Sequence, residues 1–552
     1  MILVLGASAA GLKAAARARR LMPQATITVV DQRTFISYGA CGLPYFLSGE
    51  IQNLDTLRST SYGTVRDSDY FHQVKNLDVR TGQRILAIDR GAKTVTLEST
   101  VSGEQSCLIY DQLVYALGAE PVIPAGIETG PKISTITTPE AALSLRQGLA
   151  SGAVEHCVVI GGGFVGVETT VALADMWGCE VTLLEAADRL LPRMLDAEMS
   201  RLVQAELERN DITVRTGVTV SSAVVNDGAV AIELGEGETL NADHAVVAVG
   251  VRPRTELARA AGLTLGAHGG LLVDAHLRTN DPAILAAGDC VELIHRGSGK
   301  PGLVPLGSLA NRQGRVAGDV LAGRETVFPP VVGSSAVKVF DLNVAATGLS
   351  EGAATRADLE ATAAWGAFGD RTHFYPEGGQ VYLKLVHEQV GDRLLGLQAV
   401  GPGEIIKRVD VFAALLHQGA DLGDLVDLEV CYSPPYNAPL DPLQGLAAAT
   451  LNTREMDIGQ APPGSSSDGH LVLDVRTAEE FASGEPAPLA GSINIPLEEL
   501  RRRVDEMPLD RPILVVCARG PRSFEAARIL QGHGCQNLVY LAGGVTMRAA
   551  AD

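Results

Sequence analysis

The sequence predicts an α/β fold of three or four domains, and three observations lead to this prediction. Two segments, 2–31 and 157–185, each read as a strand, a glycine-rich turn, a helix and a second strand that ends in an acidic residue. This repeated pattern is typical of two dinucleotide-binding (Rossmann-like) domains. The residues after 470 alternate short apolar strands with helices, which predicts a further small α/β domain. At 552 residues, the chain is long enough for each domain to bury its own core.

Composition and charge exclude several classes of protein. Hydrophobic residues make up 46% of the chain and charged residues 20%, which excludes a disordered protein. No apolar run reaches the roughly 18 residues of a membrane span, and the N-terminal segment lacks the basic region of a signal peptide. A net charge of −20 argues against nucleic-acid binding. We therefore expect a cytoplasmic protein that binds neither nucleic acid nor a membrane.

The first glycine-rich turn follows the apolar strand at 2–5 and precedes a helix. Gly6, Ser8 and Gly11 occupy the three glycine positions of a dinucleotide fingerprint, with serine in place of the middle glycine. Asp31 ends the next strand, where an acid binds ribose hydroxyls. Because similar turns occur without a nucleotide, this first copy alone leaves the function of the turn open.

The second glycine-rich turn is a complete match. Gly161, Gly163 and Gly166 follow an apolar strand, and Glu185 ends the next one. A carboxylate at this position accepts hydrogen bonds from both ribose hydroxyls and repels a 2′-phosphate. No arginine follows it directly, since the next residues are Ala186 and Ala187. The sequence therefore favours NADH over NADPH.

A third segment indicates that one of the two dinucleotides is a flavin. Gly288 and Asp289 follow an apolar strand, and the segment 279–290 resembles one whose aspartate binds the flavin ribityl chain in flavoproteins with two dinucleotides. The strands at 113–119 and 245–253 resemble the crossings between the two domains of such proteins. We therefore expect FAD in a discontinuous domain, residues 1–112 and 245–324, and NADH in an inserted domain, residues 113–244.

Three further regions complete the expected organisation. Residues 325–460 combine strand-like runs with a long helix, which predicts an α+β domain, and in this flavoprotein class such a domain forms the dimer interface. Residues 461–469, APPGSSSDG, predict a flexible linker. Residues 470–552 form the small C-terminal α/β domain.

The eight cysteines are scattered and none forms a CxxC pair or a zinc-binding spacing, so we expect no metal site. Cys41 stands out because it lies in the glycine-rich segment 37–49, SYGACGLPYFLSG, which we expect to pass the flavin ring. No second cysteine follows within this segment, which excludes internal dithiol chemistry there. A single thiolate beside a flavin can still cycle through a mixed disulfide, a persulfide or a sulfenate. The alternative is a buried structural cysteine.

These features together resemble a known family. The SYGACGLPY segment, the split flavin domain and the YSPPY segment at 432–436 resemble the single-cysteine coenzyme A disulfide reductases of the pyridine nucleotide-disulfide oxidoreductase family. The C-terminal unit resembles a rhodanese domain. Their combination resembles the coenzyme A disulfide reductase–rhodanese fusions, over essentially the whole chain. This resemblance implies an NADH-dependent flavoprotein reductase of persulfides or polysulfides, including coenzyme A persulfide.

The resemblance also implies a homodimer whose partner subunit completes the active site. Tyr432 and Tyr436 lie in the segment CYSPPYNAPLDP, and Tyr375 lies upstream in HFYPEGG. In the family, a tyrosine from the partner reaches the redox cysteine, and a tyrosine hydroxyl can donate a proton to a developing thiolate. Aromatic packing at the dimer interface is the alternative for each of the three.

The rhodanese resemblance rests on LDVRTAEEF (473–481), GSINIP (491–496) and VVCARGPRS (515–523). Cys517 begins a loop between a strand and a helix, whose backbone N–H groups can stabilise a thiolate or a bound sulfane sulfur. Asp474 and Arg476 fit a structural pair better than a catalytic one. The segment after Gly484 is longer than the usual family pattern and lacks its histidine, which leaves the substrate open. The loop residues expected to act with Cys517 are Arg519, Gly520, Arg522 and Ser523.

Coenzyme A carries phosphates, so an acidic protein needs a local cluster of basic residues to bind it. Arg17 and Arg20 lie three residues apart on the first expected helix and share a face. Arg58 and Ser37 are further candidates. The alternative for each arginine is a solvated surface position.

We therefore expect hydride to pass from NADH to FAD, and sulfur bound on Cys41 to be reduced to sulfide. Cys517 would take up sulfane sulfur and deliver it to Cys41, with the linker providing the reach. Coenzyme A disulfide reduction for thiol buffering is the main alternative. An NADH oxidase or peroxidase is less favoured, because Ala9 or Ala10 stands where those enzymes carry a histidine. A sulfur sensor with an inactive reductase half is disfavoured by two intact glycine loops.

Overall fold

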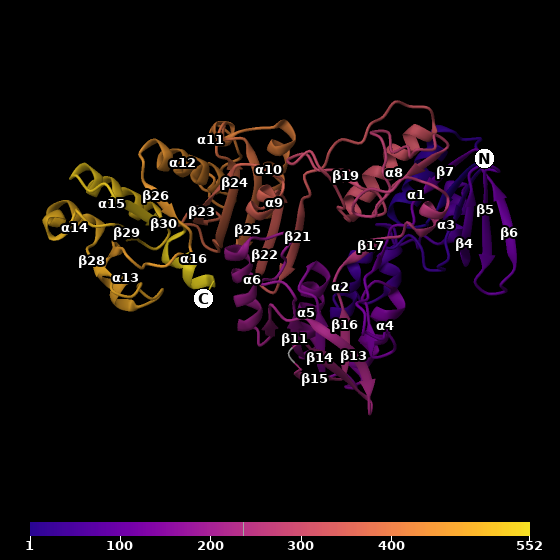
Figure 1. The fold of residues 1–552 in the computed structure, drawn as a ribbon, viewed down its shortest axis with the longest axis horizontal. Coiled ribbons are helices and arrows are strands. Elements are labelled where there is room, and N and C mark those ends of the chain that lie inside the picture. The colour runs from indigo at the N-terminus through magenta and orange to yellow at the C-terminus, as the bar shows by residue number, and fades with distance from the viewer. Residues whose placement is uncertain (236, 552) are drawn as a thin grey trace. The chain divides into compact units, whose positions relative to one another are not determined.

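The computed structural model describes residues 1–235 and 237–551 (Figure 1). Glu236 and Asp552, which fall in the expected ranges 113–244 and 470–552, lie outside this description. The chain divides into two compact units. The first comprises Met1–Ala186, Val218–His295 and Gly299–Val331, and the second comprises Ala187–Gly217, Arg296–Ser298 and Val332–Asp552.

A parallel sheet forms the centre of the first domain of the first unit (Figure 1). Its strands and flanking helices are β1 (Ile2–Leu5), α1 (Ala9–Leu21), β2 (Ile27–Val30), β3 (Asp78–Arg80), β7 (Gln112–Tyr115), β18 (Ile284–Ala286) and α8 (Gly307–Leu321). The strand order is β18-β7-β1-β2-β3. Every residue of β1 and β2 is buried, as in parallel strands covered on both faces. Because β18 pairs with β7, two distant segments build one sheet.

Shorter elements complete this domain. They are the 3₁₀ helices η1 (Ala40–Gly42) and η2 (Leu54–Arg58), the helices α2 (Leu43–Ser48), α3 (Ser68–Lys75) and α7 (Glu256–Ala260), the antiparallel strands β4 (Gln83–Asp89), β5 (Thr94–Ser99) and β6 (Gln105–Ile109), and the pair β19 (Leu293–Ile294) and β20 (Pro301–Gly302). α1 and α8 pack against each other over most of their lengths.

The inserted domain repeats the parallel arrangement. Its elements are β9 (Ile133–Ser134), α4 (Pro139–Ala150), β10 (His156–Ile160), α5 (Phe164–Trp177), β11 (Glu180–Leu184), β13 (Val220–Asn226), β14 (Ala229–Leu234), β15 (Thr239–Ala242) and β16 (His244–Val247). The parallel strands run in the order β11-β10-β16-β9, and β13, β14 and β15 form an antiparallel layer.

The crossings between these domains correct two expected boundaries. β7 pairs with β1 in the first sheet, although its residues after 112 were assigned to the inserted domain. β16 pairs with β10 in the inserted sheet, although its residues after 244 were assigned to the first domain. The chain passes between the domains in the antiparallel pair β8 (Ala119–Pro121) and β17 (Val251–Pro253). The expected boundaries are wrong by a few residues because a strand that leads into a crossing still belongs to the sheet it leaves.

The second unit contains an antiparallel sheet with the order β21-β22-β25-β24-β23 (Figure 1). Before the C-terminal domain, the elements of this unit are α6 (Ala197–Arg209), β12 (Thr213–Arg215), β21 (Ser335–Val339), β22 (Leu342–Gly348), α9 (Glu351–Arg356), β23 (Ala361–Gly369), β24 (Gln380–Glu388), β25 (Leu394–Gly401), α10 (Ile406–Gln418), α11 (Leu422–Val426) and α12 (Pro442–Glu455). β12 is not a strand of the antiparallel sheet. Lys384, fully buried in β24, lies 3.1 Å from Asp196 and 3.3 Å from Glu198. This ion cluster fixes the start of α6 against the sheet.

The C-terminal domain has a parallel sheet with the order β26-β30-β29-β27-β28. Its elements are β26 (Gly459–Ala461), β27 (Leu471–Asp474), α13 (Ala478–Ser483), β28 (Ile493–Asn494), α14 (Leu497–Arg503), η3 (Val504–Glu506), β29 (Ile513–Val516), α15 (Pro521–Gly532), β30 (Leu538–Leu541) and α16 (Gly544–Ala551). Because β26 pairs with β30, this fold begins before residue 470, and the expected linker at 461–469 starts inside a strand of the sheet.

Hydrogen bonds hold the C-terminal domain against the rest of the second unit. α16 packs on α6 and β23. Arg209 of α6 donates to the Ala550 carbonyl at 3.0 Å, and Arg548 donates to the Ser465 carbonyl at 2.7 Å. The expected linker is therefore fixed at Ser465 as well as in β26.

The described residues, 1–235 and 237–551, include no helix that is long and apolar enough to cross a membrane. Over the same residues, no group of three or more His, Cys, Asp or Glu side chains is placed to hold a metal ion.

Candidate active site

The first glycine turn is shaped by the chain's own packing. Gly6 has φ +110°, and a Cβ there would lie 2.2 Å from the Ala116 carbonyl oxygen. A Cβ on Gly11 would lie 1.9 Å from the Gly6 carbonyl oxygen. Both positions therefore require glycine. The backbone N–H of Ala7 donates to Asp31 Oδ2 at 2.7 Å, so the acid at the end of β2 lies against the turn.

The second turn repeats this geometry. Gly161 has φ +111°, and a Cβ on Gly166 would lie 1.7 Å from the Gly161 carbonyl oxygen. The N–H of Gly162 donates to Glu185 Oε2 at 2.6 Å. Around Gly163 a Cβ would meet no atom within 4 Å, so the turn is open at its middle position. The two turns thus have the same geometry, and in each a backbone N–H just after the first glycine donates to the acidic side chain.

Gly288 and Asp289 come from a distant segment to the first glycine turn. Gly288 has φ +94°, and a Cβ there would lie 3.2 Å from the Ala10 Cβ at the start of α1. Its N–H donates to Gln313 Oε1 of α8 at 2.8 Å. Burial raises the pKa of the Asp289 carboxyl. The glycines at 6, 11 and 288 let the turn, the start of α1 and this distant segment approach closely, and this arrangement fits a dinucleotide such as FAD.

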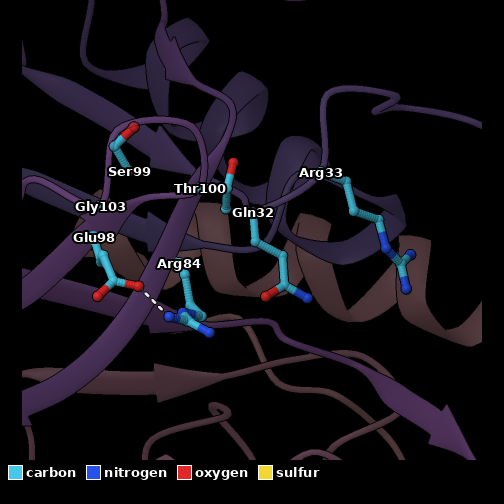
Figure 2. Close-up of a pocket in the computed structure, with 7 residues that line it drawn as sticks. All are labelled: Gln32, Arg33, Arg84, Glu98, Ser99, Thr100 and Gly103. Carbon is cyan, nitrogen blue, oxygen red and sulfur yellow. Dashed lines mark hydrogen bonds and ion pairs between the residues drawn. The ribbon is translucent and has the colours of Figure 1, made fainter.

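A hollow of about 460 Å³ lies directly after Asp31 (Figure 2). Gln32 and Arg33 line it from the end of β2, and Arg84 and Glu98 form an ion pair on its other side. Ser99, Thr100 and Gly103 complete the lining. The sequence pattern did not point to this hollow, because most of its lining comes from the antiparallel strands β4 and β5 and the turn after β5. Its place beside Asp31 fits the adenosine end of a dinucleotide.

Cys41 is exposed, in the middle of the 3₁₀ helix η1. Tyr45 follows one turn later on α2, and its pKa is raised by burial and, to a smaller extent, by the charges of Glu168, Glu50 and Cys41. Burial raises the pKa of the Glu168 carboxyl on α5 to about 7. The Cys41 thiol and the Glu168 carboxyl therefore each lie close enough to the Tyr45 phenol to raise its pKa. An exposed thiol also differs from the alternative of a buried structural cysteine.

The residues expected to bind coenzyme A separate into two groups. Arg17 is 2.6 Å from Asp319 on α8, and Arg58 is 2.7 Å from Asp55 and stacks 4.2 Å from the centre of the Phe35 ring. These two guanidinium groups hold the fold together. Arg20 is exposed, and no described residue forms an ion pair with it.

Ser37 lies beside the first glycine turn. It has φ 59°, its N–H donates to the Ala7 carbonyl at 2.9 Å, and its own carbonyl accepts from Arg66 at 3.2 Å. The sequence does not point to Arg66, because it lies in a segment without a motif.

In the second unit, the loops that carry the three tyrosines meet. Thr372 Oγ1 donates to the Pro434 carbonyl at 3.4 Å, and the N–H of Tyr375 donates to the Thr372 carbonyl. Tyr432 is 49% exposed and Tyr436 is 70% exposed. Tyr375 is half-buried. The tyrosine hydroxyls are therefore not committed to the core of this subunit.

Arg408 forms hydrogen bonds to both of these loops. It is 2% exposed and lies on α10. Its guanidinium donates to Asp441 Oδ2 at 3.0 Å, to Asn437 Oδ1 at 2.9 Å and to the Asp370 carbonyl at 2.7 Å. The sequence pattern does not single out Arg408, because Asp441, Asn437 and Asp370 are 29 to 38 residues away from it.

Cys517 directly follows β29 and is 1% exposed. The N–H of Gly520, which has φ +119° at the start of α15, donates to its sulfur at 3.1 Å. The N–H of Val545 on α16 donates to the Cys517 carbonyl at 2.9 Å. The loop therefore presents the Gly520 N–H to the sulfur, and α16 is hydrogen-bonded to the backbone of Cys517.

The charged residues around Cys517 form two pairs. Arg476 donates to both oxygens of Asp474, and both residues are buried. Asn494 Nδ2 donates to the backbone carbonyls of these two residues. Arg522 donates to both oxygens of Glu480, at 2.7 and 2.8 Å. The Ser523 hydroxyl is buried without a hydrogen-bond partner among the residues that the structure describes.

The longer segment after Gly484 is tied to the first of these pairs. The Pro486 carbonyl accepts a hydrogen bond from Arg476 at 2.8 Å.

Comparison with known proteins accounts for all of these domains. Residues 1–313 match the family model of the pyridine nucleotide-disulphide oxidoreductases, residues 334–441 match its dimerisation domain, and residues 464–547 match a rhodanese-like domain. The chain is 31% identical over 448 residues to an NAD(P)H sulfur oxidoreductase (CoA-dependent) of Pyrococcus abyssi, covering 81% of this chain and 97% of that protein.

Two solved structures are similar over nearly the full chain. A NAD-dependent persulfide reductase from A. fulgidus is 40% identical, with a TM-score of 0.95 and 99% of both chains covered. The reduced Bacillus anthracis CoADR-RHD is 31% identical, with a TM-score of 0.92 and coverage of 100% of this chain and 98% of that one.

Proposed function

Because the chain belongs to the pyridine nucleotide-disulphide oxidoreductase family, we propose that it is an FAD- and NADH-dependent reductase of persulfides and polysulfides, with a fused sulfur-transfer domain. The observation that carries the proposal is the exposed Cys41, without a second cysteine in its segment, in the same unit as two glycine turns of equal geometry. A single thiol can accept one sulfane sulfur but cannot form an internal disulfide. Coenzyme A persulfide is included among the substrates, as the names of the relatives suggest.

Each glycine turn would bind one dinucleotide. Gly6, Gly11, Asp31 and Gly288 would hold FAD, and Gly161, Gly166 and Glu185 would hold NADH. The Glu185 carboxylate would accept from the ribose hydroxyls and repel a 2′-phosphate, which favours NADH. Bound FAD would supply two electrons, taken from NADH, that release sulfur from Cys41 as sulfide.

The protein's part begins with the Cys41 thiolate. It would attack the outer sulfur of a persulfide, so that an S–S bond to Cys41 forms while the substrate's S–S bond breaks and the electron pair leaves on the thiol. The leaving thiolate needs a proton, and a tyrosine hydroxyl can supply it. Tyr375, Tyr432 and Tyr436 are candidates, because their loops meet and two of these side chains are exposed.

A second copy of the chain would cover these tyrosines. Phe374 is 66% exposed beside Tyr375, and Tyr432 and Tyr436 add further exposed aromatic surface. Such a patch favours burial against another subunit. We therefore infer a homodimer in which the tyrosines of each subunit serve the partner's Cys41. Ser37, Arg20 and Arg66 would contact coenzyme A, whereas Arg17 and Arg58 already form ion pairs in the fold.

The C-terminal domain would load Cys517 with sulfane sulfur. The contacts of α16 with α6 and the hydrogen bond from Arg548 to Ser465 argue against a freely swinging domain. We therefore infer that sulfur leaves Cys517 on a small thiol, which then carries it to Cys41.

Anaerobic NADH oxidation by the purified holoenzyme tests this function. Turnover should be fast with coenzyme A persulfide or polysulfide and slow with coenzyme A disulfide. Equal or faster disulfide turnover would contradict persulfide reduction and indicate thiol buffering instead. The Cys517→Ser variant should keep turnover on pre-formed coenzyme A persulfide but lose turnover that depends on another sulfur donor.

A further inference from the structure

The charge around Cys517 is set by a pair that the sequence motif does not reveal. Arg522 lies in the first turn of α15, and its two terminal nitrogens donate hydrogen bonds to the two carboxylate oxygens of Glu480. The Thr477 N–H donates to one of the same oxygens at 2.8 Å, within a capping box that starts α13. The hydrogen bonds from Arg522 lower the pKa of Glu480 to about 2. Glu480 is therefore ionised and firmly held, and it neutralises Arg522.

Only Arg519 remains as a cation that is not neutralised in this loop. It is exposed, and within residues 1–235 and 237–551 no carboxylate forms an ion pair with it. Arg476, the other arginine of the domain's motif, is buried in its pair with Asp474. With Cys517 as a thiolate, the side-chain charges of the loop cancel, and the Gly520 N–H and the start of α15 supply the remaining positive potential.

Two kinds of sulfane sulfur donor differ in the charge that they bring to this loop. A protonated persulfide, R–S–SH, reacts as Cys517–S⁻ + R–S–SH → Cys517–S–SH + R–S⁻. The new S–S bond forms at Cys517, the old one breaks, and its electron pair leaves on the thiolate, with one negative charge throughout. Thiosulfate reacts as Cys517–S⁻ + S–SO₃²⁻ → Cys517–S–S⁻ + SO₃²⁻, with three negative charges throughout. The second reaction needs more free cations close to the sulfur.

We propose that the Glu480–Arg522 pair makes the Cys517 loop selective for persulfides of small thiols over thiosulfate. The pair neutralises one of the two guanidinium groups that a dianionic donor would use, whereas transfer from a protonated persulfide carries less negative charge and needs fewer free cations. This inference rests on the proposed sulfur-transfer function of Cys517. It adds the class of donor, which the motif alone left open.

Sulfur transfer to cyanide by the full-length holoenzyme tests the inference. NADH is omitted, so that the reductase has no source of electrons and does not turn over. Thiocyanate formation is measured with thiosulfate and with glutathione persulfide as donors. The wild type should have the higher kcat/KM with the persulfide. Glu480→Gln keeps an acceptor for Thr477 but frees Arg522, and it should raise the thiosulfate-to-persulfide ratio of kcat/KM at least about tenfold. Glu479→Gln, an exposed neighbour without contact to Arg522, is the matched control and should leave the ratio unchanged.

Two further variants keep the test decisive if Glu480→Gln alone does not fold. Glu480→Gln/Arg522→Gln removes both charges and should return the ratio to the wild-type value. Arg519→Gln removes the one uncommitted cation and should lower the ratio about tenfold or more. A wild type that prefers thiosulfate, or an Arg519→Gln or Glu480→Gln variant with an unchanged ratio, would overturn the proposal. Loss of transfer from both donors in Cys517→Ser shows that this cysteine is used. If the wild type transfers sulfur from neither donor, the sulfur-transfer function itself fails, and the selectivity falls with it.

Discussion

Replacing Arg408 should uncouple persulfide turnover from reduction of the flavin. The Arg408→Met variant keeps a long apolar side chain in α10 but removes a guanidinium that is 2% exposed. The bonds lost are those to Asp441, Asn437 and the Asp370 carbonyl, together with one to the Glu404 carbonyl. Two of these acceptors lie on the segment that follows Tyr436, and the other two lie on the loops around Tyr375 and before α10.

The loss of stability comes from the buried Asp441 carboxylate that remains without its partner. Asp441 is 3% exposed and loses its cation, and breaking one partner of a buried ion pair costs about 3–5 kcal/mol. For a domain of this size, that loss lowers the melting temperature by roughly 10 °C. The tyrosine loops also lose the group that fixes them together, and displacement of a catalytic group by about 1 Å can cost up to about 100-fold in rate.

The assay compares two reactions of the same preparation. Stopped-flow mixing with NADH should still bleach the flavin at the wild-type rate, because the glycine turns lie in the other unit. Steady-state persulfide turnover should fall at least about tenfold. Arg454→Met is the matched control, since Arg454 forms an exposed ion pair with Asp392 in the same domain and should cost less than about 1 kcal/mol.

A second variant separates the effect on the stability of the protein from the effect on the position of the tyrosine loops. Arg408→Met/Asp441→Asn removes the stranded charge while keeping an acceptor for the Leu443 N–H at the start of α12. It should regain part of the melting temperature but none of the turnover. Wild-type turnover in Arg408→Met, or full recovery of turnover in the double variant, would refute the positioning role of Arg408.

Three further predictions concern the first unit. Cys41→Ser should lower persulfide turnover at least about a thousandfold while NADH still bleaches the flavin, measured by the same two assays. Glu185→Ala should lower kcat/KM for NADH, and it should lower the ratio of kcat/KM for NADH to that for NADPH by about tenfold or more. The reason is that no carboxylate then accepts hydrogen bonds from the ribose or repels a 2′-phosphate. An unchanged ratio would contradict the role of Glu185. Burial raises the pKa of Glu168 from 4.5 to about 7, so the folded protein binds more protons than the unfolded chain between these pH values. The free energy of unfolding should therefore fall with pH across this interval, by about 3 kcal/mol, and Glu168→Gln should flatten the fall in chemical denaturation curves.

Much of the fold could be predicted because its signals are local. A glycine turn, its helix and the acid at the end of the next strand lie within about 30 residues, and both copies could be read directly from the sequence. The loop at Cys517 and the segment around Cys41 are similarly continuous. The domain crossings were misplaced, since a strand that enters a crossing has the same apolar pattern as any other strand.

The partners of charged side chains could not be predicted in the same way. Arg17 fits a phosphate-binding surface when only α1 is considered, yet Asp319, 302 residues later, holds it in an ion pair. Arg522 fits a free cation beside Cys517 until Glu480, 42 residues earlier, is placed against it. Residue type and spacing indicate what a side chain can do, whereas the fold decides which charge neutralises it.

The two glycine turns also explain why Ser8 can stand where the pattern has glycine. The first and third positions are fixed by the chain itself, because a Cβ there would lie 1.7–2.6 Å from a backbone oxygen in both turns. The middle position differs. Gly163 has φ −80° and no atom within 4 Å of a Cβ, so packing does not require glycine there. Ser8 occupies the same place with φ −112°, and its hydroxyl is exposed and caps no backbone N–H of α1. The chain's own packing therefore leaves the middle position open, and we expect the Ser8 hydroxyl to donate a hydrogen bond to the diphosphate of a bound dinucleotide.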